Sequence, residues 1–279
     1  SNVQVWESGD RAAIRREVLR KLNAARGGGY VFLSDHSVSS GVSGDEAIWR
    51  WLHRVHDAAD RTLAPSSATI QELAARGFPR LARWGRGVDL DQFHPRRRDE
   101  ALHRALAPGG EVLVGYVGRL APEKELHRLV ALRGMPGVRL VLVGSGPSGP
   151  RLRRVLPEAA YLGFHTGDTL GAAVASLDVF VNPGDSETFC QAVQEALAAG
   201  VPVVASAAGG PLDLVDHGRT GFLVTPGDAR ALRSSVAALA YAPSTRARMG
   251  ALARASVLGR TWEALGDELL TQYAEVLGA

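Results

Sequence analysis

The chain contains 279 residues, of which 46% are hydrophobic and 22% are charged, so it can bury a substantial core in one large domain or two modest ones. Its single cysteine, Cys190, excludes an internal disulfide framework and a multi-cysteine metal cage. No stretch approaches the roughly 18 uninterrupted apolar residues that a membrane helix needs, and the chain does not open with a secretory pattern. We therefore expect a globular, cytoplasmic protein.

The net charge of +3 comes mainly from arginine, which is concentrated in runs such as residues 94–100 and 150–156. Such runs could bind nucleic acid or an anionic membrane face, but acidic residues are interspersed and no aromatic residues are interleaved for stacking. We therefore expect solvated faces and no nucleic-acid partner. Peripheral contact with anionic lipid at the inner face of a membrane stays open, because the sequence does not place the arginine-rich patch.

Apolar runs alternate with helical patterns along the chain. Strands are predicted at residues 30–34, 61–65, 111–118, 138–144, 160–164, 178–182, 202–206 and 221–225. Helices are predicted at residues 10–25, 45–59, 66–76, 123–133, 167–176, 188–199, 228–241 and 261–277. Because the strands are rich in Val, Leu and Phe without polar alternation, helices should cover both faces of the sheet. The pattern predicts an α/β fold with a doubly wound parallel sheet.

A polar stretch that contains Gly85, Gly87 and Pro95, residues 85–100, separates a short first set of elements from a longer second set. We interpret it as an interdomain linker, with a first domain at residues 1–92 and a second domain at 93–259. The last segment, residues 260–279, contains an amphipathic helix. The second domain has the strands of a complete doubly wound sheet, whereas the first domain is abbreviated.

Open α/β sheets bind ligands beyond the carboxyl ends of their strands, so the loops of the second domain are the first candidates for a site. The stretch GYVGRLAPEKEL (115–126) carries Arg119 and Lys124 after a strand, and Pro122 stands where a helix can begin. Two cations that project from one strand end suit a diphosphate. Each cation taken alone is also explained as an ordinary surface charge.

A second loop, in LVLVGSGPSGP (140–150), contains glycines that let the backbone approach a ligand closely. Its spacing does not match the G-x-G-x-x-G dinucleotide fingerprint, and it lacks the lysine of a phosphate-binding P-loop. A plain turn explains this loop equally well.

The third loop leads into the helix predicted at residues 188–199, which Gly200 closes at the position after its last turn. The first N–H groups of a helix have no partner within it, and the helix dipole places positive charge at the same end. The backbone of Thr188, Phe189 and Cys190 therefore predicts an anion site.

Two glutamates, Glu187 and Glu195, accompany this predicted helix. Glu187 would favour the helix dipole but repel a bound phosphate, so its position makes more sense if it contacts neutral hydroxyl groups beside the phosphates. Glu195 lies about 12 Å further along the axis, and helical side chains lean back toward the N-terminus. The gap suits two sugar rings joined by a diphosphate, one for each carboxylate. A solvated helix position is the alternative for Glu195.

Several motifs in order resemble one enzyme family. They are the Glu187/Glu195 pair, GRLAPEK (118–124), GRGVDLDQFHP (85–95) and GVPVVASAAGGPLDLVDHGRTGFLV (200–224). Together they resemble the retaining, nucleotide-sugar-dependent glycosyltransferases of the GT-B fold, in the family-four group that includes actinobacterial GDP-mannose-dependent mannosyltransferases. The resemblance implies two Rossmann-like domains, a shortened N-terminal acceptor domain and a C-terminal donor domain, with a last helix that crosses back to the first domain.

The resemblance also implies roles for the matching residues. Arg119 and Lys124 would neutralise the donor diphosphate and its leaving charge, Glu187 would bind donor-sugar hydroxyls, and Glu195 would bind the ribose. The full donor set that it implies is Arg119, Lys124, Gly144, Phe164, Glu187, Thr188, Phe189, Cys190 and Glu195, with Gly144 and Phe164 bordering the base. Such enzymes work without a metal or further cofactor, and stabilisation of the leaving diphosphate carries most of the catalysis.

Cys190 stands where the family usually has glycine. At a helix N-terminus its thiol could crowd the phosphates or have a lowered pKa, and we interpret it as a tolerated small residue.

The first domain is expected to face the acceptor. Its polar loop SDHS (34–37) contains His36, a candidate sugar-contacting or catalytic group for which a surface-loop histidine is the alternative. The predicted helix 45–59 and the residues after it place further histidines and aspartates near one face, where spacing permits a metal but a solvated face is favoured. These residues are His53, His56, Asp57 and Asp60.

The sequence therefore predicts a hexosyltransferase that moves a sugar, with mannose favoured, to a hydroxyl group of a glycan or glycolipid. A GDP-sugar is favoured over a UDP-sugar as donor. One alternative is another GT-B enzyme, such as an epimerase or a phosphorylase. Another is a nucleotide-sugar-binding module that lacks its acceptor domain or shares one with a partner chain. The sequence does not indicate the linkage or the oligomeric state.

Overall fold

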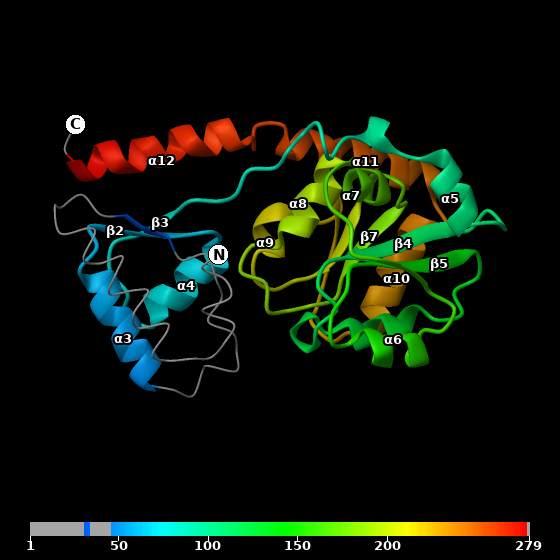
Figure 1. Ribbon diagram of the computed structural model, residues 1–279, viewed down its shortest axis with the longest axis horizontal. Helices are drawn as coiled ribbons and strands as arrows, with labels where there is room; N and C mark the ends of the chain where they lie inside the picture. Colours follow the sequence, from blue (N-terminus) through cyan, green and yellow to red (C-terminus); the bar gives the residue numbers. More distant parts are fainter. Residues whose placement is uncertain (1–30, 34–45, 278–279) are drawn as a thin grey trace.

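The structure is a computed structural model that describes residues 31–33 and 46–277. The described residues form one three-stranded and one six-stranded sheet, and all of their strand pairs are parallel. Figure 1 shows the two sheets in separate lobes that two segments of the chain connect. The α/β class and the Rossmann-like arrangement predicted from the sequence are confirmed.

The six-stranded sheet has the order β6-β5-β4-β7-β8-β9. Its strands are β4 (Val112–Val117), β5 (Val138–Val143), β6 (Ala160–Gly163), β7 (Val179–Asn182), β8 (Val203–Ser206) and β9 (Gly221–Val224). The chain first builds outward from β4 to β6 and then restarts at β7 on the other side of β4. The loops that follow β4 and β7 therefore diverge at a topological switch point, where such sheets bind ligands.

Helices cover both faces of this sheet, as the apolar strands require. One face is covered by η4 (Leu126–Leu132), α6 (Gly149–Val155) and α10 (Ala229–Ala240), and the other by α7 (Gly167–Ala175), α8 (Gln191–Ala198) and α11 (Pro243–Val257). Along β4, Leu113 and Val117 pack into one cluster, whereas Val114 and Tyr116 pack into the other. The strand carries no charged side chain, and all of its positions after the partly buried Val112 are buried.

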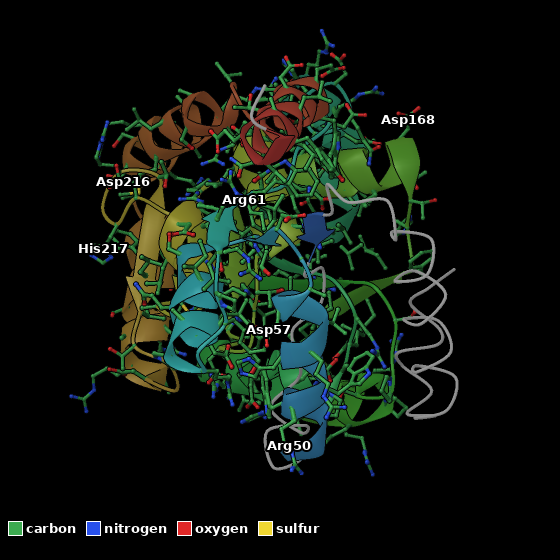
Figure 2. All side chains as sticks on the ribbon, turned by 90° about the vertical axis from the view of Figure 1, so that its left-hand side faces the viewer. Arg50, Asp57, Arg61, Asp168, Asp216 and His217 are labelled. Atoms are coloured by element: carbon green, nitrogen blue, oxygen red, sulfur yellow. The ribbon has the colours of Figure 1, made fainter. Side chains whose placement is uncertain are left out.

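The three-stranded sheet has the order β1-β2-β3 and is flanked by helices that come from both ends of the described chain. Its elements are β1 (Val31–Leu33), α3 (Glu46–Asp57), β2 (Arg61–Ala64), α4 (Ser67–Ala75) and β3 (Leu81–Arg83), together with α12 (Trp262–Leu277). Trp84 Nε1 donates to the carbonyl oxygen of Leu265 at 2.8 Å, and Arg61 donates to Gln272 at 2.7 Å. Figure 2 shows Arg61 on the side where α12 lies and Arg50 toward the opposite end of α3.

Two segments that connect the lobes pack against each other. The backbone N–H of Val88 donates to the carbonyl oxygen of Arg260 at 2.8 Å. A Cβ atom at Gly87 would lie 2.6 Å from the Trp262 side chain, so only glycine permits this approach. The boundaries proposed at residues 92 and 259 stay a prediction.

Some predicted elements differ in the structure. The helix expected at 123–133 is two 3-10 helices, η3 (Pro122–Lys124) and η4, because Glu125 between them adopts a left-handed conformation with φ 52°. β3 was not predicted, since its three residues are only partly covered and show no apolar pattern. Four short elements were also not predicted, namely η2 (Pro95–Arg97), α5 (Glu100–Leu106), α6 and α9 (Pro211–Leu214), and neither was the 15-residue helix α11. The helix predicted at 10–25 lies outside the described residues.

The arginine run 94–100 is not simply a solvated face. Nη1 of Arg98 lies 3.4 Å from the carbonyl oxygens of Ala175, Ser176 and Leu177, and its Nη2 pairs with Asp178 at 3.1 Å. Arg98 thereby satisfies carbonyl groups at the end of α7. None of the helices in residues 46–277 is long and apolar enough to span a membrane.

Candidate active site

The loops that follow β4 and β7 meet through an ion pair between two residues of the predicted site. Nζ of Lys124 lies 2.9 Å from Oε1 and 3.0 Å from Oε2 of Glu187, although the residues are 63 positions apart. The side chains are 25% and 10% exposed, so water screens the pair only in part. Lys124 neutralises Glu187, and the carboxylate is therefore compatible with an anion bound nearby.

Glycines allow the loops after β4, β7 and β8 to approach one another. A Cβ atom at Gly184 would lie 3.2 Å from the carbonyl oxygen of Lys124, and one at Gly209 would lie 2.0 Å from that of Glu187. The N–H of Gly210 donates to the same Glu187 carbonyl at 2.7 Å. No role was predicted for Gly209 or Gly210. The usable signal was the double glycine that follows a predicted strand in the family motif.

Arg119, the other predicted cation, lies on the same loop after β4 as Lys124. Its side chain is 57% exposed, and its Nη1 lies 3.8 Å from Oε1 of Glu123. The buried hydroxyl of Tyr116 donates to the carbonyl oxygen of Arg119 at 3.1 Å and so anchors this loop. Burial, together with the charge of Glu187, raises the pKa of Tyr116, so its hydroxyl stays protonated as a donor. Sequence reasoning missed Tyr116, since it stands within a strand.

Helix α8 starts later than predicted, at Gln191. Glu187 therefore lies on the preceding loop and is not fixed by helical spacing. Cys190 is the residue before the helix and has a left-handed backbone with φ 69°. The end of the helix agrees with the prediction, because Gly200 is left-handed with φ 71° and donates to the carbonyl oxygen of Leu197 at 3.0 Å.

Glu195 lies on α8 in a partly buried position. Burial raises the pKa of its carboxyl to about 7, and a hydrogen bond from Gln191 opposes part of that rise. The same glutamine donates to the carbonyl oxygen of Gly87 at 3.0 Å, and Gln194 donates to that of Arg86 at 2.9 Å. The helix that carries Glu195 is thus bonded to the interdomain linker.

Cys190 does not have the lowered pKa considered above. Its thiol is buried, and burial raises its pKa well above the usual value. Nδ2 of Asn182 donates to its Sγ at 3.1 Å. The thiol is therefore held as a neutral packing group.

The remaining predicted donor-side residues occupy different environments. Gly144 is a packing glycine, because a Cβ atom there would lie 1.9 Å from the carbonyl oxygen of Gly118. Phe164 follows β6 and is 74% exposed, whereas Phe189 is buried in the core. Thr188 accepts a hydrogen bond at its carbonyl oxygen from Thr69 Oγ1 at 3.4 Å. Of these aromatic side chains, Phe164 is the one available to a ligand.

The three-stranded lobe contacts this region through the start of α4. Its Ser67 N–H donates to Oδ2 of Asp213 at 2.7 Å, which adds a second contact to that of Thr69 with Thr188. Neither residue was predicted. The signal for Ser67 was the capping serine that precedes it, Ser66. His36, the acceptor-side candidate, lies outside the described residues.

The histidines of α3 serve packing. The ring of His53 stacks on Phe78 at 4.0 Å, and Nδ1 of His56 lies 2.9 Å from Oγ1 of Thr62. Burial, assisted by neighbouring His53, lowers the pKa of His56 to about 4, so this ring is neutral at pH 7. His56 is buried and not on a solvated face. Within residues 46–277 no group of three His, Cys, Asp or Glu side chains is placed to hold a metal ion.

Comparison with known proteins shows which family residues 111–241 match and which fold the chain has. Residues 111–241 match the family described as Glycosyl transferases group 1. The structure resembles that of HepE from Anabaena in complex with UDP and glucose, with a TM-score of 0.82 and 23% identity over 94% of this chain and 75% of that one. The domain at residues 111–241 therefore belongs to the group 1 glycosyltransferases, and the chain has the GT-B fold.

Among relatives, the chain is 49% identical over 243 residues to a GDP-mannose-dependent alpha-mannosyltransferase of Mycolicibacterium smegmatis, a match that covers 87% of this chain. It is 43% identical to the protein of that name from Corynebacterium glutamicum, over 83% of this chain. The chain spans 64% of the length of the first relative and 56% of that of the second. The motifs that indicated the family-four mannosyltransferases thus identified the right relatives.

Proposed function

We propose that this protein is a retaining hexosyltransferase that transfers mannose from GDP-mannose to a hydroxyl group of a glycan or glycolipid. The observation that carries the proposal is the Lys124–Glu187 ion pair at the switch point of the donor sheet, followed on the next helix by Glu195. The names of the mannosyltransferases from M. smegmatis and C. glutamicum support GDP-mannose as donor.

In this proposal the diphosphate lies beside Arg119 and Lys124. Both cations are attached to the loop after β4, and the exposed guanidinium of Arg119 can reach a ligand at the mouth of the site. Their charge opposes the negative charge that develops on the diphosphate as the bond between sugar and phosphate breaks. Such preorganised electrostatic stabilisation is commonly the largest contribution to catalysis.

Glu187 binds hydroxyl groups of the donor sugar. With Lys124 on both carboxylate oxygens, its charge is largely compensated, yet each oxygen keeps a lone pair for a sugar hydroxyl. Glu195 binds the ribose hydroxyls from α8. Ionised, it accepts a hydrogen bond from each hydroxyl, which makes ribose binding dependent on pH near the pKa of about 7.

Retention of the anomeric configuration follows if the acceptor hydroxyl attacks from the face that the diphosphate leaves. The departing phosphate then takes the proton of the acceptor. No further cofactor enters this scheme. A glycolipid acceptor would place the protein in the cytoplasm with peripheral contact at the inner face of the membrane, and this localisation is part of the proposal.

Calorimetric titration with GDP, UDP and ADP tests the donor site. We expect micromolar binding of GDP, and its loss in Glu195→Ala and in Arg119→Ala. GDP release from GDP-mannose, with mannosides or glycolipids as acceptors, then tests transfer. GDP binding without turnover under any acceptor would instead indicate a nucleotide-sugar-binding module. Absence of binding by all three nucleotides would overturn the proposal.

A further inference from the structure

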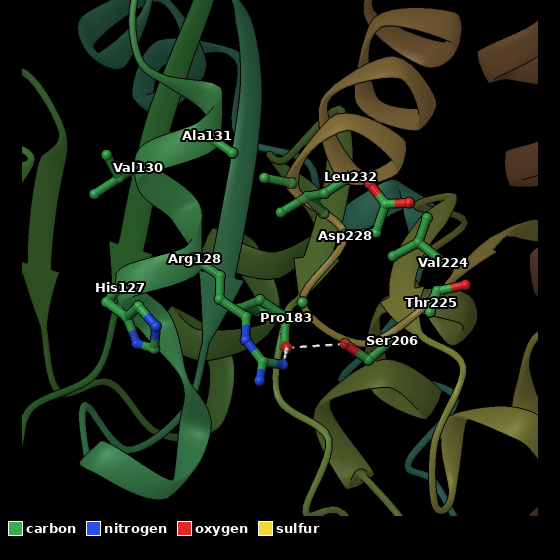
Figure 3. A pocket seen from close by; sticks show the side chains of 12 residues that line it. His127, Arg128, Val130, Ala131, Pro183, Ser206, Val224, Thr225, Asp228 and Leu232 are labelled. Carbon is green, nitrogen blue, oxygen red and sulfur yellow. Dashed lines mark hydrogen bonds between the residues drawn. The ribbon is translucent and has the colours of Figure 1, made fainter.

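A second cation holds the loop that carries Glu187. Nη1 of Arg128 donates to the carbonyl oxygen of Pro183 at 2.9 Å, and its Nη2 donates to Oδ2 of Asp185 at 2.8 Å. The hydroxyl of Ser206, at the end of β8, donates to the same Pro183 carbonyl at 2.8 Å (Figure 3). The start of the loop is therefore fixed by three hydrogen bonds from two other elements.

The backbone between the two cations explains how both reach one loop. Lys124 ends η3 and Arg128 lies in η4, with Glu125 between the two helices in the left-handed conformation. A continuous helix would place residues 124 and 128 roughly one turn apart on one face. Here the left-handed residue reorients the second helix, so that Lys124 contacts the end of the loop, Glu187, while Arg128 contacts its start.

The surroundings of Arg128 indicate that it holds other groups of the chain in place and does not form a separate ligand site. Arg128 lines a groove of about 420 Å³ between η4 and α10 (Figure 3). Two other polar groups there have partners within the chain, since Ser206 donates to Pro183 and Oδ1 of Asp228 accepts from the N–H of Ala231 at 2.8 Å. The planar guanidinium donates in two directions at once, which a lysine ammonium on a flexible stem reproduces poorly.

We infer that Arg128 is a positioning residue for donor-sugar recognition: by holding Pro183 and Asp185 it sets the orientation in which Glu187 meets the sugar. The inference rests on the proposed function. We expect Arg128 to affect binding of the sugar and not of the nucleotide. Arg128 contacts the loop that carries Glu187, whereas Glu195 lies on α8 beyond that loop.

The test compares the dissociation constants of GDP and GDP-mannose for Arg128→Met. Losing a charge-assisted pair of hydrogen bonds should weaken GDP-mannose binding about 10-fold, while GDP binding changes less than about 2-fold. Arg233→Met is the matched control, because Arg233 is another arginine whose guanidinium donates to backbone carbonyl oxygens, at 2.7 Å to Ala131 in η4 and at 3.0 Å to Arg133 directly after it. It does not touch loop 183–187 in these contacts and should change neither constant.

Asp185→Asn provides a second variant should Arg128→Met fail to fold. It keeps the shape of the side chain and removes its charge, and it should weaken GDP-mannose binding in the same direction but by less. Unchanged GDP-mannose binding in the folded variants, or equal weakening of both ligands, would overturn the inference and leave the donor site standing. Wild-type protein that binds no GDP would overturn the proposed function itself.

Discussion

Glu187 and Glu195 stand in neighbouring regions of the chain, but those regions treat a carboxylate differently. The loop before α8 pairs Glu187 with Lys124 through both oxygens. The body of α8 surrounds Glu195 with buried residues and raises its pKa to about 7, with Gln191 as a hydrogen-bond neighbour. One carboxylate is stabilised as an anion by a partner, whereas the other is poised between its charged and neutral forms.

The difference shows that spacing in the sequence does not determine whether a carboxyl group is paired with a cation or has a raised pKa. The two glutamates were predicted as a matched pair, with Glu187 just before the helix predicted at 188–199 and Glu195 within it. The partner of Glu187 comes from the loop after another strand, and the environment of Glu195 comes from the helix's burial against the linker and the core. Three predictions test this contrast.

The largest effect is expected for Lys124→Met. Removing the lysine leaves Glu187 uncompensated in a mostly buried position and removes a cation from the proposed diphosphate site. We expect GDP-mannose binding to weaken about 100-fold and the free energy of unfolding to fall by about 1–3 kcal/mol. Calorimetric titration and urea denaturation measure the two effects.

Two further variants serve as controls for the stability loss in Lys124→Met. Lys124→Met combined with Glu187→Gln should recover most of the lost stability but not the binding, because it removes the unpaired charge without restoring the cation. Arg133→Met breaks a half-exposed pair with Glu158 at 3.1 Å and should cost less than about 1 kcal/mol. A stability loss for Lys124→Met no greater than for Arg133→Met would contradict the buried pairing.

The second prediction is a difference in stability between wild type and Glu195→Gln that depends on pH. The folded protein raises the pKa of the Glu195 carboxyl from 4.5 to about 7. The contribution of this group to the free energy of unfolding is therefore fully present below pH 4.5 and is lost as the pH rises through 7. Glutamine resembles the protonated carboxyl. The variant should therefore match wild type near pH 4.5 and exceed it by up to about 3 kcal/mol at pH 8.

Urea denaturation between pH 4.5 and 8 checks this prediction. In the same window, GDP binding to wild type should strengthen as the pH rises through 7, because the ionised carboxylate accepts two ribose hydroxyls, and the variant should lack this dependence. A constant stability difference across the window would show that Glu195 is not desolvated as described.

The last prediction changes no residue and concerns Cys190, which lies between the two glutamates. Its buried, protonated thiol should react with iodoacetamide at pH 8 at least about 100-fold more slowly in the native protein than in urea. Mass spectrometry over a time course measures the ratio, and free cysteine under both conditions is the control. Equal rates would place the thiol in an exposed or open segment.

Local patterns predicted much of the six-stranded sheet. Apolar strands without polar alternation indicated a sheet covered on both faces. Gly200 correctly predicted the end of α8, because the residue that closes a helix there adopts the left-handed conformation that glycine favours. The start of that helix was missed, since nothing in the sequence marks the left-handed Cys190. For the same reason, the split of one predicted helix at Glu125 was invisible.

Composition, strand pattern and motif order determined the α/β class, the strands of the six-stranded sheet and the candidate residues Lys124, Glu187 and Glu195, because these depend on local chemistry and on short spacings. The pairing of Lys124 with Glu187, the contacts of Arg128 and the raised pKa of Glu195 arose only when β4 and β7 were placed side by side and α8 was buried. Contacts across tens of residues depend on strand order and on desolvation, which a linear pattern does not encode.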